Sequence, residues 1–176
     1  MLFSSVKLTG AYLITPEARE DDRGFFARVF CVDEFEQQGL CCEWQQANIA
    51  HNKLKGITRG MHYQHAPDDE VKLVRCTKGS VFDAIVDMRV DSPTYRQWYG
   101  ATLTEANQHM LYVPSGFAHG YQVLEDNTDL HYMVSARYAP QSEAGVRWDD
   151  PLIGIDWPIT ADVLLSDKDK TWSLLN

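Results

Sequence analysis

The sequence lacks the features that mark several large classes of protein. It contains no run of basic residues, and its 25 Asp and Glu against 16 Lys and Arg give a formal net charge of -9. A chain with that balance is poorly suited to the phosphate backbone of nucleic acids. No apolar run approaches the ~18 residues that a membrane-spanning helix requires. We therefore expect neither nucleic acid nor a membrane as a partner.

Cysteine is also scarce. The four cysteines are Cys31, Cys41, Cys42 and Cys76, and no two of them form a CxxC pair. This pattern fits neither a structural zinc site nor a disulfide framework. The first residues show no basic segment followed by an apolar core, which a signal peptide would have. We therefore expect a cytoplasmic protein with reduced thiols.

What remains is the composition of an ordinary globular protein. The chain has 176 residues, of which 44% are hydrophobic and 23% charged. That length fits a single domain with a buried core. Tryptophan and tyrosine are spread from Tyr12 to Trp172, and no linker or repeat interrupts them. The sequence predicts one continuous domain, residues 1–176.

Short alternating segments dominate the chain. In residues 80–89, Phe82, Ala84 and Val86 share one face of a predicted strand, whereas Asp83 and Asp87 lie on the other. This pattern predicts carboxylates on an inward or pocket-lining face. Residues 72–76, 109–113 and 130–134 alternate in the same way.

Turn residues separate these segments at short intervals, and little of the chain is helical in pattern. Many short strands with few helices predict an all-β sandwich or jelly-roll barrel. Two short flanking helices are expected, over residues 32–38 and 159–165.

Two segments resemble the signature motifs of the cupin superfamily of jelly-roll barrels. Gly56 and His62 fit the first motif, and His119 fits the histidine of the second, in residues 114–120. The second histidine of the first motif is replaced by Gln64, and the motif glutamate by Lys72. An ammonium group has no lone pair to give a metal. We therefore expect a cupin-like barrel without a bound metal, and an anionic ligand or reaction charge as the partner of Lys72.

A closer resemblance covers nearly the whole chain, from about residue 10 to residue 169. The chain resembles the dTDP-4-dehydrorhamnose 3,5-epimerase family, whose motifs occur here in order at residues 22–26 (DRGFF), 46–48 (QAN), 59–64 (RGMHYQ), 72–74 (KLV), 87–94 (DMRVDSPT), 114–120 (PSGFAHG), 148–151 (WDDP) and 166–169 (SDKD). Each motif alone is a weak signal, but eight collinear ones are strong.

The resemblance implies a role for each matching residue. His62 would be the catalytic base, oriented by Asp169, and Tyr132 would be the acid on the opposite face of the sugar. Lys72 would stabilise an enolate. The residues implied in holding the nucleotide sugar are Arg23, Gln46, Asn48, Arg59, His119, Glu143 and Lys168, with Tyr138 stacked on the base. The family also implies a homodimer.

The chain departs from the family pattern at a few positions near these residues. Arg28 stands where the family usually has Glu, and Glu70 stands where Gln is common. Two usual serines are replaced by Ala50 and Asn52. We expect Arg28 to contact the ligand and to alter which nucleotide or sugar is preferred. The alternative is that Arg28 points to solvent, as most arginines do.

The implied chemistry is removal of a hydrogen beside a ketone and its return on the other face. A neutral histidine can take such a hydrogen, and a nearby cation stabilises the enolate that forms. No cofactor is required. The main interpretation is a cofactor-independent isomerase that epimerises C3, C5 or both in a nucleoside-diphosphate 4-keto-6-deoxyhexose. The alternatives are a single-centre epimerase, an enzyme for a GDP- or CDP-linked sugar, a metal-dependent cupin oxygenase or isomerase, and a non-catalytic sugar-binding cupin.

Overall fold

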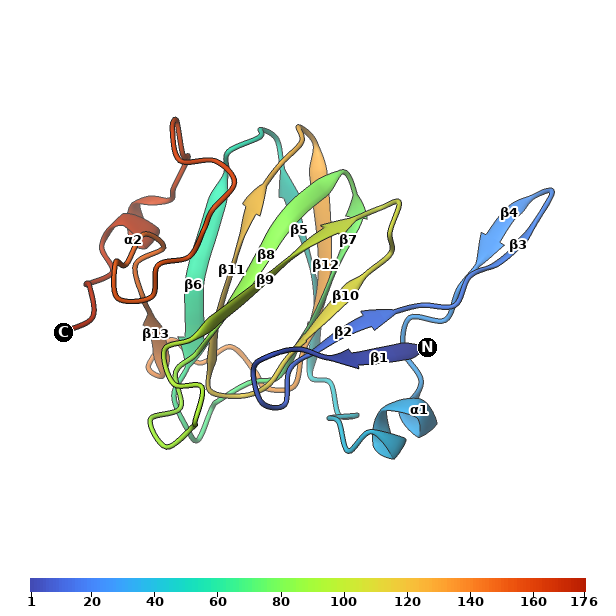
Figure 1. Ribbon diagram of the computed structural model, residues 1–176, viewed down its shortest axis with the longest axis horizontal. Coiled ribbons are helices and arrows are strands. Elements are labelled where there is room, and N and C mark those ends of the chain that lie inside the picture. Colours follow the sequence, from blue (N-terminus) through green and yellow to red (C-terminus); the bar gives the residue numbers. More distant parts are fainter.

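The computed structural model describes residues 1–176, and almost all of its regular structure is β (Figure 1). One sheet has six strands in the order β1 (Leu2–Ser5), β2 (Tyr12–Thr15), β10 (Met110–Val113), β7 (Lys72–Lys78), β12 (Thr128–Val134) and β5 (Gln46–Asn52). The other has five, in the order β13 (Glu143–Gly145), β6 (Thr58–Gln64), β11 (Phe117–Val123), β8 (Ser80–Asp87) and β9 (Trp98–Thr104). All neighbouring strands are antiparallel. The predicted all-β, cupin-like jelly roll is confirmed.

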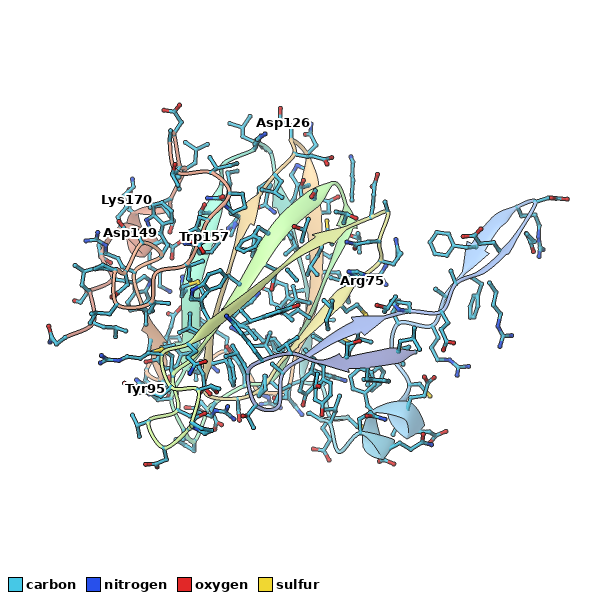
Figure 2. All side chains as sticks on the ribbon, viewed as in Figure 1. Arg75, Tyr95, Asp126, Asp149, Trp157 and Lys170 are labelled. Carbon is cyan, nitrogen blue, oxygen red and sulfur yellow. The ribbon has the colours of Figure 1, made fainter.

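The alternation in residues 80–89 corresponds to the two faces of β8. Val81 and Ile85 belong to the largest core cluster, which includes residues of both sheets. Ala84 and Val86 face the other way and pack with Trp157 from the C-terminal segment. Figure 2 shows Trp157 between that segment and the five-stranded sheet. The barrel therefore has one core between its sheets and a second core outside the five-stranded sheet.

The first predicted helix is confirmed as α1 (Val32–Gln37), which begins after Cys31. Its Phe35 is fully buried and packs edge-on against Phe3 and Tyr112. The helix ends before Gly39, which has a φ of 68°. That left-handed conformation is accessible to glycine without steric cost, and it allows the chain to leave the helix.

The second predicted helix, over residues 159–165, is wrong. This segment is irregular because its backbone groups are bound to other parts of the barrel. The Ile159 N–H donates to the Gln122 side chain, and Leu164 exchanges hydrogen bonds with residues 56 and 58. The helix is instead α2 (Asp167–Lys170), which begins after Ser166; the Ser166 hydroxyl accepts a hydrogen bond from the Asp169 N–H.

A small hairpin, β3 (Arg19–Asp21) and β4 (Gly24–Phe26), projects away from the barrel (Figure 1). All six of its strand residues are exposed, including Phe25 and Phe26 at 55% and 69%. The two aromatic side chains give this projecting arm an apolar surface that is uncovered in the single chain.

None of the helices is long and apolar enough to cross a membrane.

Candidate active site

A cavity of about 220 Å³ opens between the two sheets. Its walls are formed by Ala50, Arg59, His62, Lys72, His119, Gly120, Tyr121 and Tyr132. Strands β6 and β11 supply residues from the five-stranded sheet, and β5, β7 and β12 supply residues from the six-stranded sheet. The barrel thus brings together side chains that are far apart in the sequence.

His62 and Asp169 form a hydrogen-bonded pair at this cavity. His62 lies on β6, and Asp169 arrives from α2, 107 residues later. The His62 Nε2 atom is hydrogen-bonded to the Asp169 carboxylate, so Nδ1 is the ring nitrogen without a protein partner. The Trp172 ring lies tilted beside His62, in a space where a Cβ on Gly145 would clash. Gly145 therefore allows the C-terminal segment to pack closely against β6.

The Asp169 carboxylate is ionised in this setting. Its side chain is only 3% exposed, and burial alone would raise its pKa. The hydrogen bond and charge of His62 outweigh that effect, and they hold the pKa of Asp169 below its usual value. A buried carboxylate on one ring nitrogen fixes the orientation of the imidazole and stabilises its protonated form.

Lys72 is buried in the cavity wall, with its side chain 10% exposed. Its Nζ lies 3.0 Å from a Glu70 carboxylate oxygen and donates to the His62 carbonyl oxygen at 3.3 Å. The sequence had predicted a ligand or a reaction charge as the partner of Lys72. That expectation is incomplete, because Glu70 already supplies an anionic partner two residues earlier in the chain.

Two tyrosines line the cavity, but they differ in their hydrogen bonds. The Tyr121 hydroxyl donates to the Asn52 side chain at 3.3 Å. The Tyr132 hydroxyl has no hydrogen bond to the protein, so its proton is available to a ligand. Burial raises the pKa of Tyr132, by more than the positive charge of Arg59 lowers it. Tyr132 therefore stays protonated at neutral pH and is the free proton donor of the cavity.

Arg59 is a cation without a carboxylate partner. Its Nε donates to the Asn52 carboxamide oxygen at 3.0 Å, and no Asp or Glu oxygen lies within 4 Å of the guanidinium. An arginine at a cavity wall whose terminal nitrogens are unpaired is suited to bind an anion bidentately.

His119 lies opposite His62 in the pairing of β11 with β6. Its Nε2 is 3.0 Å from both oxygens of Asp83, which is fully buried on β8. The predicted inward face of β8 is thereby confirmed for Asp83. No three His, Cys, Asp or Glu side chains are grouped so that they could hold a metal ion, and the ammonium of Lys72, which has no lone pair, stands at the position of a motif ligand.

A second group of predicted residues lies at the rim, next to β13. The Glu143 carboxylate accepts hydrogen bonds from Lys168 and from the Tyr138 hydroxyl, and the Tyr138 N–H donates to Gln46. Burial would raise the pKa of Glu143, but these two donors hold it below its usual value. Asn48 pairs with Tyr132 across β5 and β12.

Arg23 and Arg28 are not brought to the cavity of their own chain. Arg23 sits in the turn of the β3–β4 hairpin, 90% exposed and paired only with Asp21. Arg28 follows the hairpin, is largely exposed, and lies 3.4 Å from Glu34 of α1. Within one chain, neither residue is placed to bind the same ligand as His62.

Sequence reasoning missed the partners of the predicted residues. Tyr121 was not considered, Asp83 was predicted only to face inward or toward a pocket, and Glu70 and Asn52 were named only as departures from the family pattern, without a partner. Strand alternation could have revealed Glu70. Side chains two residues apart on extended backbone point to the same face, so Glu70 is expected on the same face as Lys72. The family pattern marks Asn52 only as a replacement of a usual serine, and nothing in the sequence indicates its partners on the opposite sheet.

The family model for dTDP-4-dehydrorhamnose 3,5-epimerase matches residues 5–176. The chain belongs to this family. A family member from Sinorhizobium fredii, a dTDP-4-dehydrorhamnose 3,5-epimerase, is 41% identical over 171 residues, which cover 97% of this chain and 88% of the relative. A dTDP-4-dehydrorhamnose 3-epimerase from Streptomyces niveus is 40% identical over 169 residues, which cover 96% of this chain and 81% of that one.

A solved family structure has the same fold. The dTDP-4-dehydrorhamnose 3,5-epimerase from Bacillus anthracis, crystallised with TDP and PPi bound, matches with a TM-score of 0.95 and 37% identity over 99% of each chain. The predicted family, its cupin-like jelly roll and its isomerase class are confirmed.

Proposed function

We propose that this chain epimerises C3, C5 or both of a dTDP-linked 4-keto-6-deoxyhexose, without a metal or organic cofactor. The observation that carries the proposal is the placement of the base and the acid. His62 lies on β6 of one sheet, and Tyr132 lies on β12 of the facing sheet, with the cavity between them. Inversion of a carbon requires proton removal from one side and proton return from the other, and this arrangement supports both steps.

The chemistry follows from the groups present. The Nδ1 atom of His62 accepts the hydrogen beside the C4 ketone, and Asp169 stabilises the resulting imidazolium. The electrons of the broken C–H bond delocalise to the ketone oxygen, which becomes an enolate oxygen. The ammonium of Lys72 stabilises that negative charge. Tyr132 then donates its proton to the carbon from the opposite side, and solvent returns each group to its starting state.

Arg59 supports the proposal that the cavity binds the nucleotide part of the substrate. Arg59 has no carboxylate partner, and a diphosphate supplies the negative charge that it lacks. The exposed ring of Tyr138, held by Glu143 and Gln46, is placed to stack on a base. A relative with TDP and PPi bound supports thymidine as the nucleoside.

A homodimer would allow Arg23 to take part in binding the ligand. Its hairpin projects away from the barrel and carries the exposed Phe25 and Phe26 (Figure 1). We propose that the hairpin packs on a second copy of the chain and brings Arg23 to that copy's cavity. The pairing would bury both aromatic rings and give the arginine an anionic partner.

A single-centre epimerase is the second candidate. The relative from Streptomyces niveus is named as a 3-epimerase, and its 40% identity nearly equals the 41% of the Sinorhizobium fredii 3,5-epimerase. Sequence identity to these two relatives therefore does not distinguish an enzyme that inverts one carbon from an enzyme that inverts two.

The proposal is tested by His62→Ala assayed with dTDP-4-keto-6-deoxyglucose. We expect loss of turnover and of hydrogen exchange with solvent together, each by at least ~10²-fold, as for removal of a general base. His65→Ala is the control, because His65 is exposed and its ring contacts only Tyr63. A folded His62→Ala protein that exchanges at the rate of the control would exclude His62 as the base.

A further inference from the structure

Asn52, the last residue of β5, is fully buried and fully hydrogen-bonded. Its Nδ2 donates to the carbonyl oxygens of Ala50 at 3.1 Å and Thr128 at 3.3 Å. Because both amide hydrogens are directed at backbone acceptors, the orientation of the side chain is fixed. Its Oδ1 atom must then point toward the cavity wall.

That oxygen accepts two hydrogen bonds from the opposite sheet. One comes from Arg59 Nε on β6, at 3.0 Å, and the other from the Tyr121 hydroxyl on β11, at 3.3 Å. Asn52 therefore connects β5 of the six-stranded sheet to two neighbouring strands of the five-stranded sheet. Both side chains that it holds line the cavity.

We propose that Asn52 is a positioning residue that sets the plane of the Arg59 guanidinium, and so the place where the diphosphate of the ligand binds. This inference rests on the proposed nucleotide-sugar function. A guanidinium is planar, so fixing the direction of its Nε–H fixes the directions of the two terminal nitrogens. With Nε occupied by an uncharged oxygen, the full positive charge and the bidentate edge remain for an anion.

Asn52 has a second effect, on Tyr121. Burial raises the pKa of Tyr121 to about 12, so this phenol keeps its proton and needs an acceptor. Because Asn52 takes that hydrogen bond, the Tyr121 hydroxyl is directed away from the sugar. The cavity is left with one free phenol, that of Tyr132.

The test is Asn52→Ser, which introduces the serine that is usual here in the family. A serine hydroxyl is too short to reach both partners and the two backbone carbonyls, so the variant asks whether asparagine holds Arg59 more firmly in this chain than the usual residue would. We would measure the Kd of thymidine diphosphate by calorimetry, together with KM and kcat. Thymidine diphosphate lacks the reacting sugar, so its Kd reports on binding of the nucleotide and not on the chemical steps. We expect Kd and KM to rise about tenfold and kcat to stay within about twofold, the pattern for loss of binding shared by ground state and transition state.

Gln122→Ser is the matched control. Gln122 is also fully buried, and its side chain bonds Thr58 at 3.0 Å and Ile159 at 2.9 and 2.7 Å. It follows Tyr121 on β11, so it points to the opposite face of the sheet. The control should lower the Tm by a similar amount and leave the Kd of thymidine diphosphate unchanged.

A double variant shows whether Asn52 acts through Arg59. In an Arg59→Lys background, Asn52→Ser should cause no further loss of affinity, because a lysine has no Nε–H to orient. An unchanged Kd for Asn52→Ser, an equal loss in Gln122→Ser, or full additivity with Arg59→Lys would each overturn the role of Asn52. Failure of the unmodified protein to bind thymidine diphosphate would instead remove the proposed function, and this inference with it.

Asn52→Asp covers the case in which the serine variant does not fold. It retains the shape and the acceptor oxygen, and it places a carboxylate beside Arg59. The ion pair should neutralise the guanidinium and weaken thymidine diphosphate at least tenfold. A folded Asn52→Asp protein with the affinity of the unmodified chain would contradict the proposal.

Discussion

Tyr132 is the residue whose removal separates the two halves of the proposed reaction. Tyr132→Phe keeps the ring and removes only the hydroxyl, which has no partner in the protein. We expect His62 still to form the enolate, while proton return from the facing sheet fails. The measurement is NMR in deuterated water, which should show continued hydrogen exchange with inversion reduced by ~10²-fold or more. Inversion at the normal rate by a folded Tyr132→Phe protein would assign the acid role to another group.

Lys72 distinguishes stabilisation of the enolate from binding of the substrate. Lys72→Met keeps the bulk of the side chain and removes its charge. Because the enolate charge develops mainly in the transition state, we expect kcat to fall by ~10²-fold or more and KM to change by severalfold at most. Steady-state kinetics decide the matter, with Lys7→Met, which lies outside the cavity, as the control. A rise in KM at constant kcat would identify Lys72 as an anchor for the ligand.

At the residue scale, the sequence is more informative about the side chains proposed to react than about the side chains that hold them in place. His62 and Lys72 stand within quoted motifs, Tyr132 was assigned through the resemblance to the family, and all three line one cavity. The contacts of their neighbours were not predicted, because hydrogen-bond partners depend on how strands pair across the barrel. Asn52 is the clearest case, since its contacts come from strands of the opposite sheet.

At the scale of elements, the β3–β4 hairpin has no evident role within a single chain. In a symmetric dimer, the cavity of each chain would receive Arg23 from its neighbour. This leads to a complementation test. His62→Ala and Arg23→Ala proteins should each be nearly inactive alone.

Mixing the two variants, with exchange of subunits, should restore activity. About half of the dimers would contain one chain of each kind, and one of the two cavities in such a dimer would have both residues, which gives about a quarter of the normal activity. A mixture of His62→Ala with Tyr132→Phe should show no such recovery, because both residues belong to the same cavity. Absence of recovery in the first mixture, with exchange of subunits verified by mass spectrometry, would contradict the exchange of hairpins.

Elements were predictable where the side chains alternate and not where the chain is irregular. The strands around residues 80–89 and 130–134 followed from their two-residue period, although β8 packs one face in the core between the sheets and the other in the core outside the five-stranded sheet. Residues 159–165 have apolar side chains at a helical spacing, but hydrogen bonds to Gln122 and to residues 56 and 58 hold them in another conformation. Such tertiary hydrogen bonds override a short helical pattern.

At the scale of the whole molecule, the barrel gives the proposed removal and return of a proton a common cavity. Its two sheets present His62 and Tyr132 from opposite walls, and the C-terminal helix supplies Asp169 behind the base. A lone His or Tyr in the sequence does not indicate that geometry. The resemblance to the family predicted the pair, whereas the facing sheets are visible only in the fold.

The central claim is that inversion proceeds through an enolate that protein side chains form without a metal or an organic cofactor. Incubation with dTDP-4-keto-6-deoxyglucose in deuterated water, with and without a metal chelator, tests it most directly. Because the Tyr132 hydroxyl exchanges with solvent, the account predicts one deuteron at each inverted carbon, at C3, C5 or both, and an equal rate in chelator. A product inverted at a carbon that keeps its original hydrogen, or activity abolished by the chelator, would contradict the account.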